Sequence, residues 1–345
     1  MYLQNAWYVA AWDREIGREP VARTLLDQPV VLYRTQDGTP VALEDRCCHR
    51  HLPLSLGTVI GDDLQCGYHG LRFDAAGACV EVPGQSLVPP GAAVRAYPVT
   101  ERWGWVWIWM GEAERADPSK IPDFWYMDHP DWACARPNVM HLDCSYRLIT
   151  DNVLDVTHLA YVHASSIGNQ AITEFPVKTE QDGGMVRLSR WILDRPPPPM
   201  YKAAGKFHGN VDRWQIVEHV PPCYSVNDAG CAEVGSGAPD GDRGHGIELK
   251  AVSVPTPETE RTCHYFFAFP RAFALDDPAM DKVFDEDFVD VFREDVAVLE
   301  AQQRMLDLAP DAPTIDINVD AAPLAARRML DRMIAAERDG ANLRK

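Results

Sequence analysis

The stretch from residue 47 to residue 70, CCHRHLPLSLGTVIGDDLQCGYHG, carries the strongest signal in this chain. It contains two Cys/His pairs, Cys47-x-His49 and Cys66-x2-His69, with sixteen residues between His49 and Cys66. Two thiolates and two imidazoles can bind a tetrahedral zinc ion or a 2Fe–2S cluster, in which the cysteines hold one iron and the histidines the other. Zinc fingers place their two histidines close together, whereas here each loop offers one Cys and one His. The pattern therefore favours the cluster, with zinc as the alternative.

Length and composition narrow the class of protein. The chain has 345 residues, of which 46% are hydrophobic, enough for about two globular domains with ordinary cores. A net charge of −18 argues against nucleic acid, because phosphate binding needs clustered Lys and Arg. The N-terminal sequence lacks the pattern of a signal peptide, no stretch is apolar for the length of a membrane span, and the nine cysteines are scattered. We expect a soluble cytoplasmic enzyme without a membrane or nucleic-acid partner.

The chain divides into two predicted domains. Residues 1–111 consist of short β-rich runs separated by turn signals, which predicts a small antiparallel β domain. A charged, proline-containing linker follows, and residues 112–345 mix strand-like alternation with a helical C-terminal part. The segment 227–246 is rich in Gly, Asp and Ser, which predicts a mobile loop that covers a pocket. A disordered insertion is the alternative for that segment.

A second candidate metal site lies in the second domain. Asn152, Asp155 and His158 are three residues apart, a spacing that places them on one helical face, and His163 follows five residues later. Five residues turn a regular helix by about 140°, so both imidazoles meet one metal only if the helix breaks or widens after His158. Two histidines with this spacing are equally compatible with a structural pair.

A buried carboxylate strengthens the case for a metal. The segment 281–306 predicts a helix whose apolar stripe includes Asp295. An ionised carboxylate on a buried face needs a cation, because its desolvation is otherwise too costly. Arg293 and Arg304 are alternative partners for Asp295. His158, His163 and Asp295 together would form a 2-His-1-carboxylate triad, which leaves positions open on Fe(II) for dioxygen.

The two signatures together resemble the oxygenase components of the Rieske non-heme iron oxygenases. Within that family the chain is similar to the vanillate O-demethylase oxygenases, with toluenesulfonate and dicamba monooxygenases as relatives. The resemblance implies an α+β fold with an N-terminal antiparallel β Rieske domain and a helix-grip catalytic domain. The stretches that carry it are Asn5–Ala10, Cys66–Leu71, Asp151–Gly168, Asp212–Ile216 and Ile317–Asp320.

The resemblance also assigns roles to individual residues. The cluster ligands are Cys47, His49, Cys66 and His69, and the iron ligands are His158, His163 and Asp295. The family forms a homotrimer, in which an aspartate hydrogen-bonds a cluster histidine of one subunit and an iron histidine of the next. Here that catalytic bridge would be Asp155, in line with His69 and His158 across an interface.

The implied activity is that of a terminal monooxygenase with a separate reductase. A flavin and ferredoxin-type reductase would pass electrons from NADH to the cluster, because this chain has no Gly-rich nucleotide loop. With O2 as cosubstrate, the enzyme would oxidise a small aromatic compound. The specific expectation is O-demethylation of a methoxybenzoate such as vanillate, with formaldehyde release.

Several alternatives stay open at this point. Hydroxylation or dihydroxylation of another aromatic acid or hydrophobic ring compound would use the same iron sites. A non-catalytic Rieske electron carrier would need only the first domain. Among residues outside the ligand sets, Asn152 is a candidate support for the iron site, and His264 and Arg213 are candidate substrate contacts. A core histidine and a surface ion pair are the respective alternatives for the last two.

Overall fold

The computed structural model describes residues 1–137, 139–244 and 246–342. The chain forms two compact units, the first made of Met1–Pro122 and Thr256–Glu260, the second of Asp123–Pro255 and Arg261–Lys345. Each unit has its own sheets and core, and the α+β class is confirmed. The compact units divide after Pro122, while the domain boundary placed after residue 111 stays a prediction.

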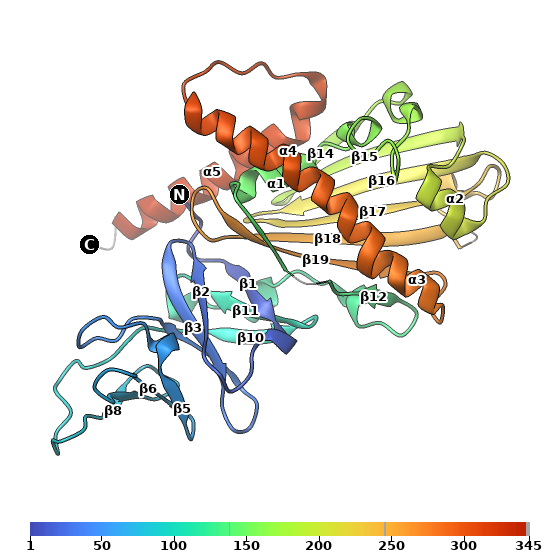
Figure 1. Ribbon diagram of the computed structural model, residues 1–345. Coiled ribbons are helices and arrows are strands. Elements are labelled where there is room, and N and C mark those ends of the chain that lie inside the picture. The colour runs from blue at the N-terminus through green and yellow to red at the C-terminus, as the bar shows by residue number, and fades with distance from the viewer. Residues whose placement is uncertain (138, 245, 343–345) are drawn as a thin grey trace. The chain divides into compact units, whose positions relative to one another are not determined.

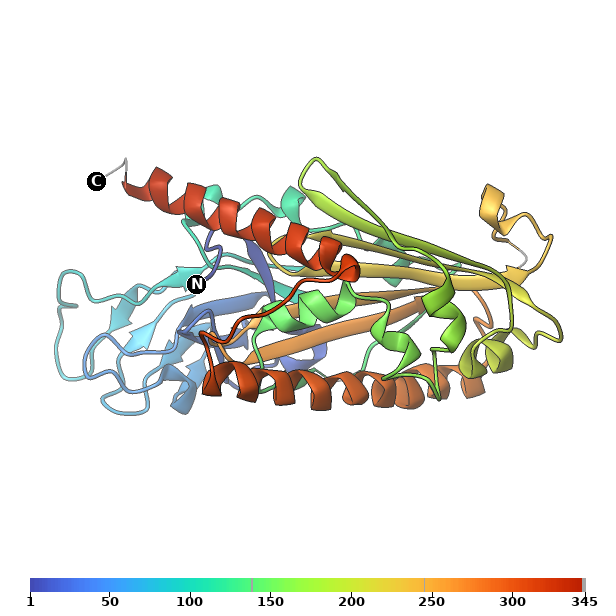
Figure 2. The same ribbon diagram turned by 90° about the horizontal axis from the view of Figure 1, so that it is seen from above.

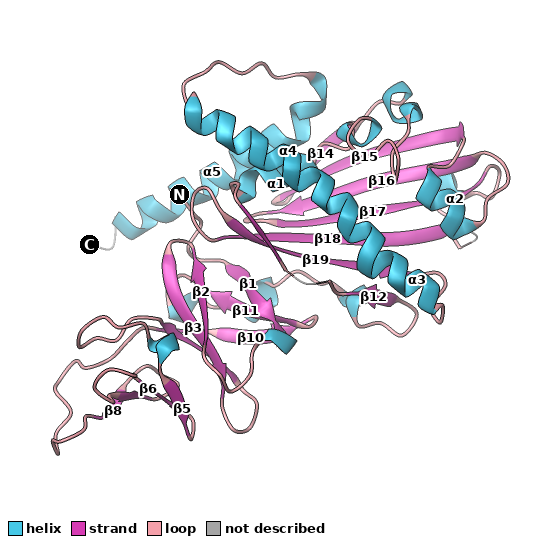
Figure 3. Cartoon of the chain, viewed as in Figure 1, coloured by secondary structure: helices cyan, strands magenta, loops and turns pink. Residues whose placement is uncertain are grey.

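Antiparallel sheets build the first unit, with strand orders β1-β11-β10, β2-β3-β4-β9 and β5-β6-β7-β8 (Figure 3). The strands are β1 (Trp7–Trp12), β2 (Val21–Leu25), β3 (Gln28–Arg34), β4 (Pro40–Glu44), β5 (Thr58–Ile60), β6 (Asp63–Gln65), β7 (Arg72–Phe73), β8 (Cys79–Glu81), β9 (Ala96–Tyr97), β10 (Val99–Arg102) and β11 (Trp105–Trp109). Tryptophans at alternate positions of β11 pack against those of β1, with ring centroids 5.1 Å apart for Trp12 and Trp105. This packing anchors the first sheet.

The first unit is discontinuous in sequence, because the segment Thr256–Glu260 belongs to it. The N–H groups of Leu26 and Asp27 donate to the carbonyls of Pro257 and Glu258, both at 2.9 Å. The buried Thr256 hydroxyl donates to the carbonyl of Val9 at 2.8 Å. A short stretch from far along the chain thus satisfies backbone groups of the N-terminal unit.

A large antiparallel sheet dominates the second unit, in the order β12-β19-β18-β17-β16-β15-β14, with β13 also paired to β19. Its strands are β12 (Ala133–Ala135), β13 (Met140–Leu142), β14 (Lys178–Asp182), β15 (Met185–Arg195), β16 (Val211–Val220), β17 (Tyr224–Glu233), β18 (Ile247–Pro257) and β19 (Cys263–Arg271). The helices are α1 (Tyr146–Val153), α2 (Pro199–Gly205), α3 (Pro278–Lys282), α4 (Phe288–Leu308) and α5 (Ala321–Asn342), with a π-helical turn at Val283–Asp287. Figures 1 and 2 both show α4 running alongside this sheet. None of the helices described could span a lipid bilayer.

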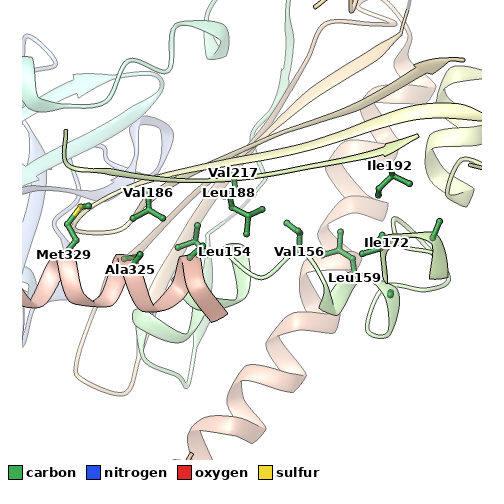
Figure 4. Packing of buried hydrophobic residues seen from close by; sticks show 14 residues of the cluster. Leu154, Val156, Leu159, Ile172, Val186, Leu188, Ile192, Val217, Ala325 and Met329 are labelled. Carbon is green, nitrogen blue, oxygen red and sulfur yellow. The ribbon is translucent and has the colours of Figure 1, made fainter. Parts of the chain in front are cut away.

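Helices cover one face of the large sheet, here called the inner face. Because side chains alternate along a strand, Val186 and Leu188 of β15 point to the same side as Val217 of β16. These residues pack against Ala325 and Met329 of α5 (Figure 4). The register places Arg213 and Gln215 on this inner face too, and so the sheet presents polar groups toward the covered side.

The segment 227–246 differs from the loop predicted for it. Strand β17 continues to Glu233, so the loop expectation is wrong for residues 227–233. The polar residues there are held in the sheet by pairing, since the Asp228 carboxylate lies 2.9 Å from Arg243 and 3.1 Å from Lys250. A short 3₁₀ turn at Ala238–Asp240 follows. Residue 245 lies outside the described residues, and mobility of the remaining loop stays a prediction.

Candidate active site

Two equivalent loops carry the predicted cluster ligands, one between β4 and β5 and the other between β6 and β7. The N–H of His51 donates to the carbonyl of Cys47 at 3.0 Å, and the N–H of Gly70 donates to that of Cys66 at 3.1 Å. The closing residue of each turn has positive φ, 59° for His51 and 73° for Gly70. Glycine suits this conformation, and histidine adopts it in the first loop. The two cysteines therefore start matching turns.

The four predicted ligands gather as two pairs. Cys47 and Cys66 are both buried, and burial raises the pKa of the Cys47 thiol to about 11. The rings of His49 and His69 are exposed, with centroids 4.6 Å apart. A buried sulfur pair and an exposed imidazole pair fit a 2Fe–2S cluster with one iron on each pair. Binding iron would replace the thiol protons.

The second predicted site follows a break in the helix. Helix α1 ends before Asp155, and His158 begins a separate 3₁₀ turn, so the continuous helical face predicted for this segment is wrong. The buried guanidinium of Arg190 donates to the Val156 carbonyl at 3.3 Å and to the Thr157 hydroxyl at 2.9 Å. The Asp155 carboxylate accepts the Thr157 N–H at 2.8 Å. These hydrogen bonds stabilise a turn that a continuous helix could not form.

The turn brings the two histidines together with the carboxylate of α4. His163 Nε2 lies 3.1 Å and His158 Nε2 lies 3.4 Å from Asp295 Oδ1. One potential ligand atom from each residue lies within 4.8 Å of the others. The amide of Asn152 donates to the same carboxylate oxygen at 3.0 Å. Two imidazoles and one carboxylate at this spacing fit a mononuclear iron, and Asn152 orients the carboxylate.

Electrostatics at this site favours a cation. Burial lowers the pKa of His163, but the carboxylates of Asp295 and Glu294 outweigh burial and raise it overall. Burial acts to raise the pKa of Asp295, yet the imidazoles of His158 and His163 hold it well below its usual range. Glu294 Oε2 lies 2.6 Å from His163 Nδ1 and fixes that ring. The sequence-based prediction missed Glu294, whose only signal is its position directly before Asp295.

Asp155 contacts His158 in a way that the sequence did not predict. Its backbone carbonyl, rather than its carboxylate, faces His158 Nδ1 at hydrogen-bond distance. Its carboxylate also attracts the buried guanidinium of Arg190. The bridge from Asp155 to His69 of another subunit therefore stays a prediction.

A cavity lies beside the triad within the second unit. On the inner face of the sheet, β17 and β18 contribute the small residues Ala229, Ala251 and Ser253, which leave this space open. Tyr265 and Phe292 form an aromatic wall, with stacked rings 5.7 Å apart. The cavity can therefore receive a flat, apolar ring next to the triad.

Polar side chains also line this cavity. The Arg213 side chain is buried, donates from Nη2 to the carbonyl of Ile167 at 3.0 Å and lies 4.7 Å over the ring of Tyr201. The surface ion pair considered for Arg213 is thus wrong. Both amide atoms of Gln215 and Oδ1 of Asn227 have no hydrogen-bond partner within the described structure. Strand alternation was the available signal for Gln215, two residues after Arg213.

His264 is not among the residues that line this cavity. It is buried on β19 directly before Tyr265, so alternation directs it to the opposite side from the Tyr265 ring that lines the cavity. Its own ring lies 5.7 Å from that of His141 on the neighbouring strand β13. We therefore do not retain His264 as a substrate contact.

Comparison with known proteins assigns both parts of the chain to known domain families. Residues 6–98 match the Rieske 2Fe–2S domain family, and residues 142–336 match the family of the vanillate O-demethylase oxygenase C-terminal domain. The chain belongs to the Rieske non-heme iron oxygenases. This Rieske oxygenase is an oxidoreductase, and its two domain families account for the two ligand groups described above. The alternative of a stand-alone electron carrier is wrong, because the catalytic domain is present.

Relatives of this Rieske oxygenase cover its whole length. It is 43% identical to the toluene-4-sulfonate monooxygenase iron-sulfur subunit of Comamonas testosteroni, over 99% of both chains. It is 38% identical to a vanillate O-demethylase oxygenase subunit of Pseudomonas sp., over 99% of this chain and 98% of that one. The crystal structure of dicamba monooxygenase bound to dicamba superposes with a TM-score of 0.89 at 34% identity, covering 98% and 99% of the two chains.

The family also decides between iron and zinc. A dicamba monooxygenase structure with non-heme iron, at 32% identity and a TM-score of 0.84, shares the fold of this Rieske oxygenase. The Rieske domain and the catalytic domain together imply an iron–sulfur cluster and a mononuclear iron. The zinc alternative for the cysteine and histidine pairs is therefore wrong.

Proposed function

We propose that this oxygenase removes the methyl group of a methoxybenzoate such as vanillate and releases formaldehyde. The observation that carries the proposal is the cavity in which the triad meets an aromatic wall and the buried Arg213. A flat ring with one anionic end and one oxidisable end suits that lining. Relatives named as vanillate and dicamba O-demethylases, at 37–38% identity, support the same chemistry.

A second candidate is hydroxylation of another aromatic acid. It is favoured by the higher identity, 43%, to a toluene-4-sulfonate monooxygenase subunit. Oxidation of a ring-bound methyl group and oxidation of a methoxy group need the same approach of a C–H bond to the triad. The two candidates differ after hydroxylation, because only the hydroxylated methoxy group breaks down, to a phenol and formaldehyde.

The residues of the chain would bind and orient the substrate. When bound, the cluster supplies single electrons and the mononuclear iron activates dioxygen. Tyr265 and Phe292 would hold the ring and exclude water, while Asn152 and Glu294 keep the ligand side chains in place. Hydroxylation of an aryl methyl ether gives a hemiacetal, ArO–CH2OH. Its bond between the ether oxygen and the methyl carbon then breaks, giving a phenol and formaldehyde.

Electrons would come from a separate protein. Relatives are named as oxygenase components, which supports a flavin and ferredoxin-type reductase that oxidises NADH. In the second unit a groove lined by Asp155, His158 and Ile315 opens beside the iron site. We place the exposed His49 and His69 of a second copy on this groove, as in the homotrimer that the family resemblance implies. Light scattering of the protein loaded with cluster and iron would test for the trimer. A monomer in solution would reject this arrangement.

The decisive experiment is reconstitution with a suitable reductase, NADH and vanillate. Formaldehyde equal to the oxygen consumed is expected, and the His163→Ala variant should form none. Oxygen uptake without formaldehyde would reject demethylation of vanillate. A parallel reaction with 4-toluenesulfonate that yields an alcohol would favour the second candidate.

A further inference from the structure

A buried positive charge on the inner face of the sheet lacks a counter-ion. The Arg213 side chain is 2% exposed, and its Nε and Nη1 have no hydrogen-bond partner within the described residues. Its one hydrogen bond goes to a neutral group, the carbonyl of Ile167. No described carboxylate lies within 4.0 Å of the guanidinium. A buried cation in this state is costly unless an anion completes the site.

The surroundings of Arg213 add further unpaired donors rather than acids. Gln215 is 1% exposed, and neither of its amide atoms has a hydrogen-bond partner in the described structure. Its register partner on β15 is Arg190, a second buried guanidinium on the same face. Burial lowers the pKa of Arg190 to about 10; the Asp155 carboxylate opposes this lowering, and the positive charge of Arg213 adds to it. The inner face is thus electropositive where these strands meet.

The unpaired groups face the space beside the triad. Arg213 and Gln215 line the same cavity as His158, His163 and Asp295. Alternation along β16 puts both polar side chains on one side, two residues apart. The Tyr201 ring lies against the planar guanidinium and restricts its movement. Unpaired guanidinium N–H groups and an unpaired amide N–H are therefore available to a ligand in this cavity.

The geometry points to Arg213 and Gln215 as the binding site for the anionic oxyacid group of the aromatic substrate. The inference rests on the proposed function in one respect, namely that the ligand of this cavity is the substrate. A planar guanidinium donates two parallel N–H bonds to a carboxylate, and a sulfonate offers equivalent oxygens. A neutral carboxamide of the same shape lacks that charge. Arg213 and Gln215 then determine specificity for aromatic acids over neutral ring compounds.

Binding can be measured without turnover. Anaerobic titration calorimetry of the iron-loaded protein, without reductase, would use three probes: 4-methoxybenzoate, 4-toluenesulfonate and the neutral 4-methoxybenzamide. We expect the wild type to bind at least one of the two anions roughly 10-fold or more tightly than the amide. The anion with the larger dependence on Arg213 identifies carboxylate or sulfonate as the preferred group.

Two cavity variants and one control separate the inference from a general structural effect. Arg213→Gln should weaken binding of that anion by roughly 10- to 100-fold and change amide binding by less than about 3-fold. Gln215→Met should weaken anion binding without lowering Tm, because the amide has no partner within the protein. The matched control is Arg187→Gln, which removes an exposed charge paired with Glu218 and should leave anion binding unchanged.

Defined results would overturn the inference. It fails if neither anion binds more tightly than the amide, or if Arg213→Gln with an intact cluster spectrum and iron content keeps wild-type anion affinity. If Arg213→Gln does not fold, Gln215→Met decides alone. Formaldehyde formation together with Arg213-independent affinity would reject this inference and leave the proposed function standing. Arg213-dependent affinity for an anion that is never demethylated would support this inference and reject the proposed function.

Discussion

Glu294 illustrates how one residue outside the ligand set holds a metal site. Its carboxylate lies 2.6 Å from Nδ1 of His163, while Nε2 of the same ring faces Asp295. A carboxylate behind a ligating imidazole fixes the ring and increases its basicity. The ring is buried, so few other groups can replace this contact.

Replacing Glu294 should therefore weaken iron binding. We expect Glu294→Ala to lower Fe(II) affinity at the triad by roughly 10- to 100-fold, with a smaller effect for Glu294→Gln. The measurement is Fe(II) titration followed by iron analysis, with the visible spectrum of the cluster unchanged. Glu286→Ala, at an exposed glutamate just before α4, is the matched control. Wild-type iron affinity in Glu294→Ala would show that the contact has no role in metal binding.

A different buried histidine should make stability depend on pH. His219 is 1% exposed, shares a hydrogen bond of 2.9 Å with Ser225, and burial lowers its pKa from 6.5 to about 4. The unfolded chain then takes up a proton at a higher pH than the folded chain does. The contribution of His219 to stability is complete above pH 6.5 and decreases as the pH falls toward 4.

The expected loss is on the order of 3 kcal/mol of unfolding free energy. Denaturant unfolding at pH 7 and at pH 4.5 would be compared between the wild type and His219→Gln, so that contributions of other groups cancel. The variant should lose less stability on acidification. Equal losses of unfolding free energy in both proteins would mean that His219 takes up its proton as readily in the folded chain as in the unfolded chain.

At the scale of elements, the turn from His158 to Gly168 carries both histidines of the triad. A Cβ atom added at Gly168 would lie 1.7 Å from the carbonyl oxygen of Leu159, so the backbone of this turn must move in Gly168→Ala. We expect a loss of about 1–3 kcal/mol of stability and of most triad iron. Gly209→Ala, where nothing lies within 4 Å of the added atom, is the control. Thermal unfolding and iron analysis check both, and an iron-replete Gly168→Ala would contradict this account.

Much of this element pattern could be predicted from sequence, and the exceptions have physical causes. Ligand spacing indicated both metal sites, and the apolar stripe around Asp295 predicted the helix that became α4. A break after His158 was one of the two options for a shared metal, but its actual position, before Asp155, was not predictable, because it depends on Arg190, a residue more than thirty positions away. The strand through residue 233 was missed because ion pairs to Asp228 compensate its polar sequence. His264 was misplaced because the strand period alone does not say which side faces the cavity.

For the whole molecule, the two ligand groups lie in separate compact units. Cluster and triad together predict about three irons per chain. Cys66→Ser should remove about two of them and the visible spectrum of the cluster, whereas His163→Ala should remove about one. Iron and acid-labile sulfide analysis of both variants checks this. Loss of all iron in Cys66→Ser would contradict independent loading of the units.

The discontinuous first unit bears on how this protein is made. Its N-terminal strands emerge from the ribosome early, but the partners of Leu26 and Asp27 are on Pro257 and Glu258. At ordinary translation speeds the intervening chain takes roughly 10–50 s to synthesise. During that time the backbone donors of Leu26 and Asp27 lack these partners, although both cluster loops have already been translated. A cluster inserted before residue 258 is synthesised would therefore enter a unit that is still incomplete.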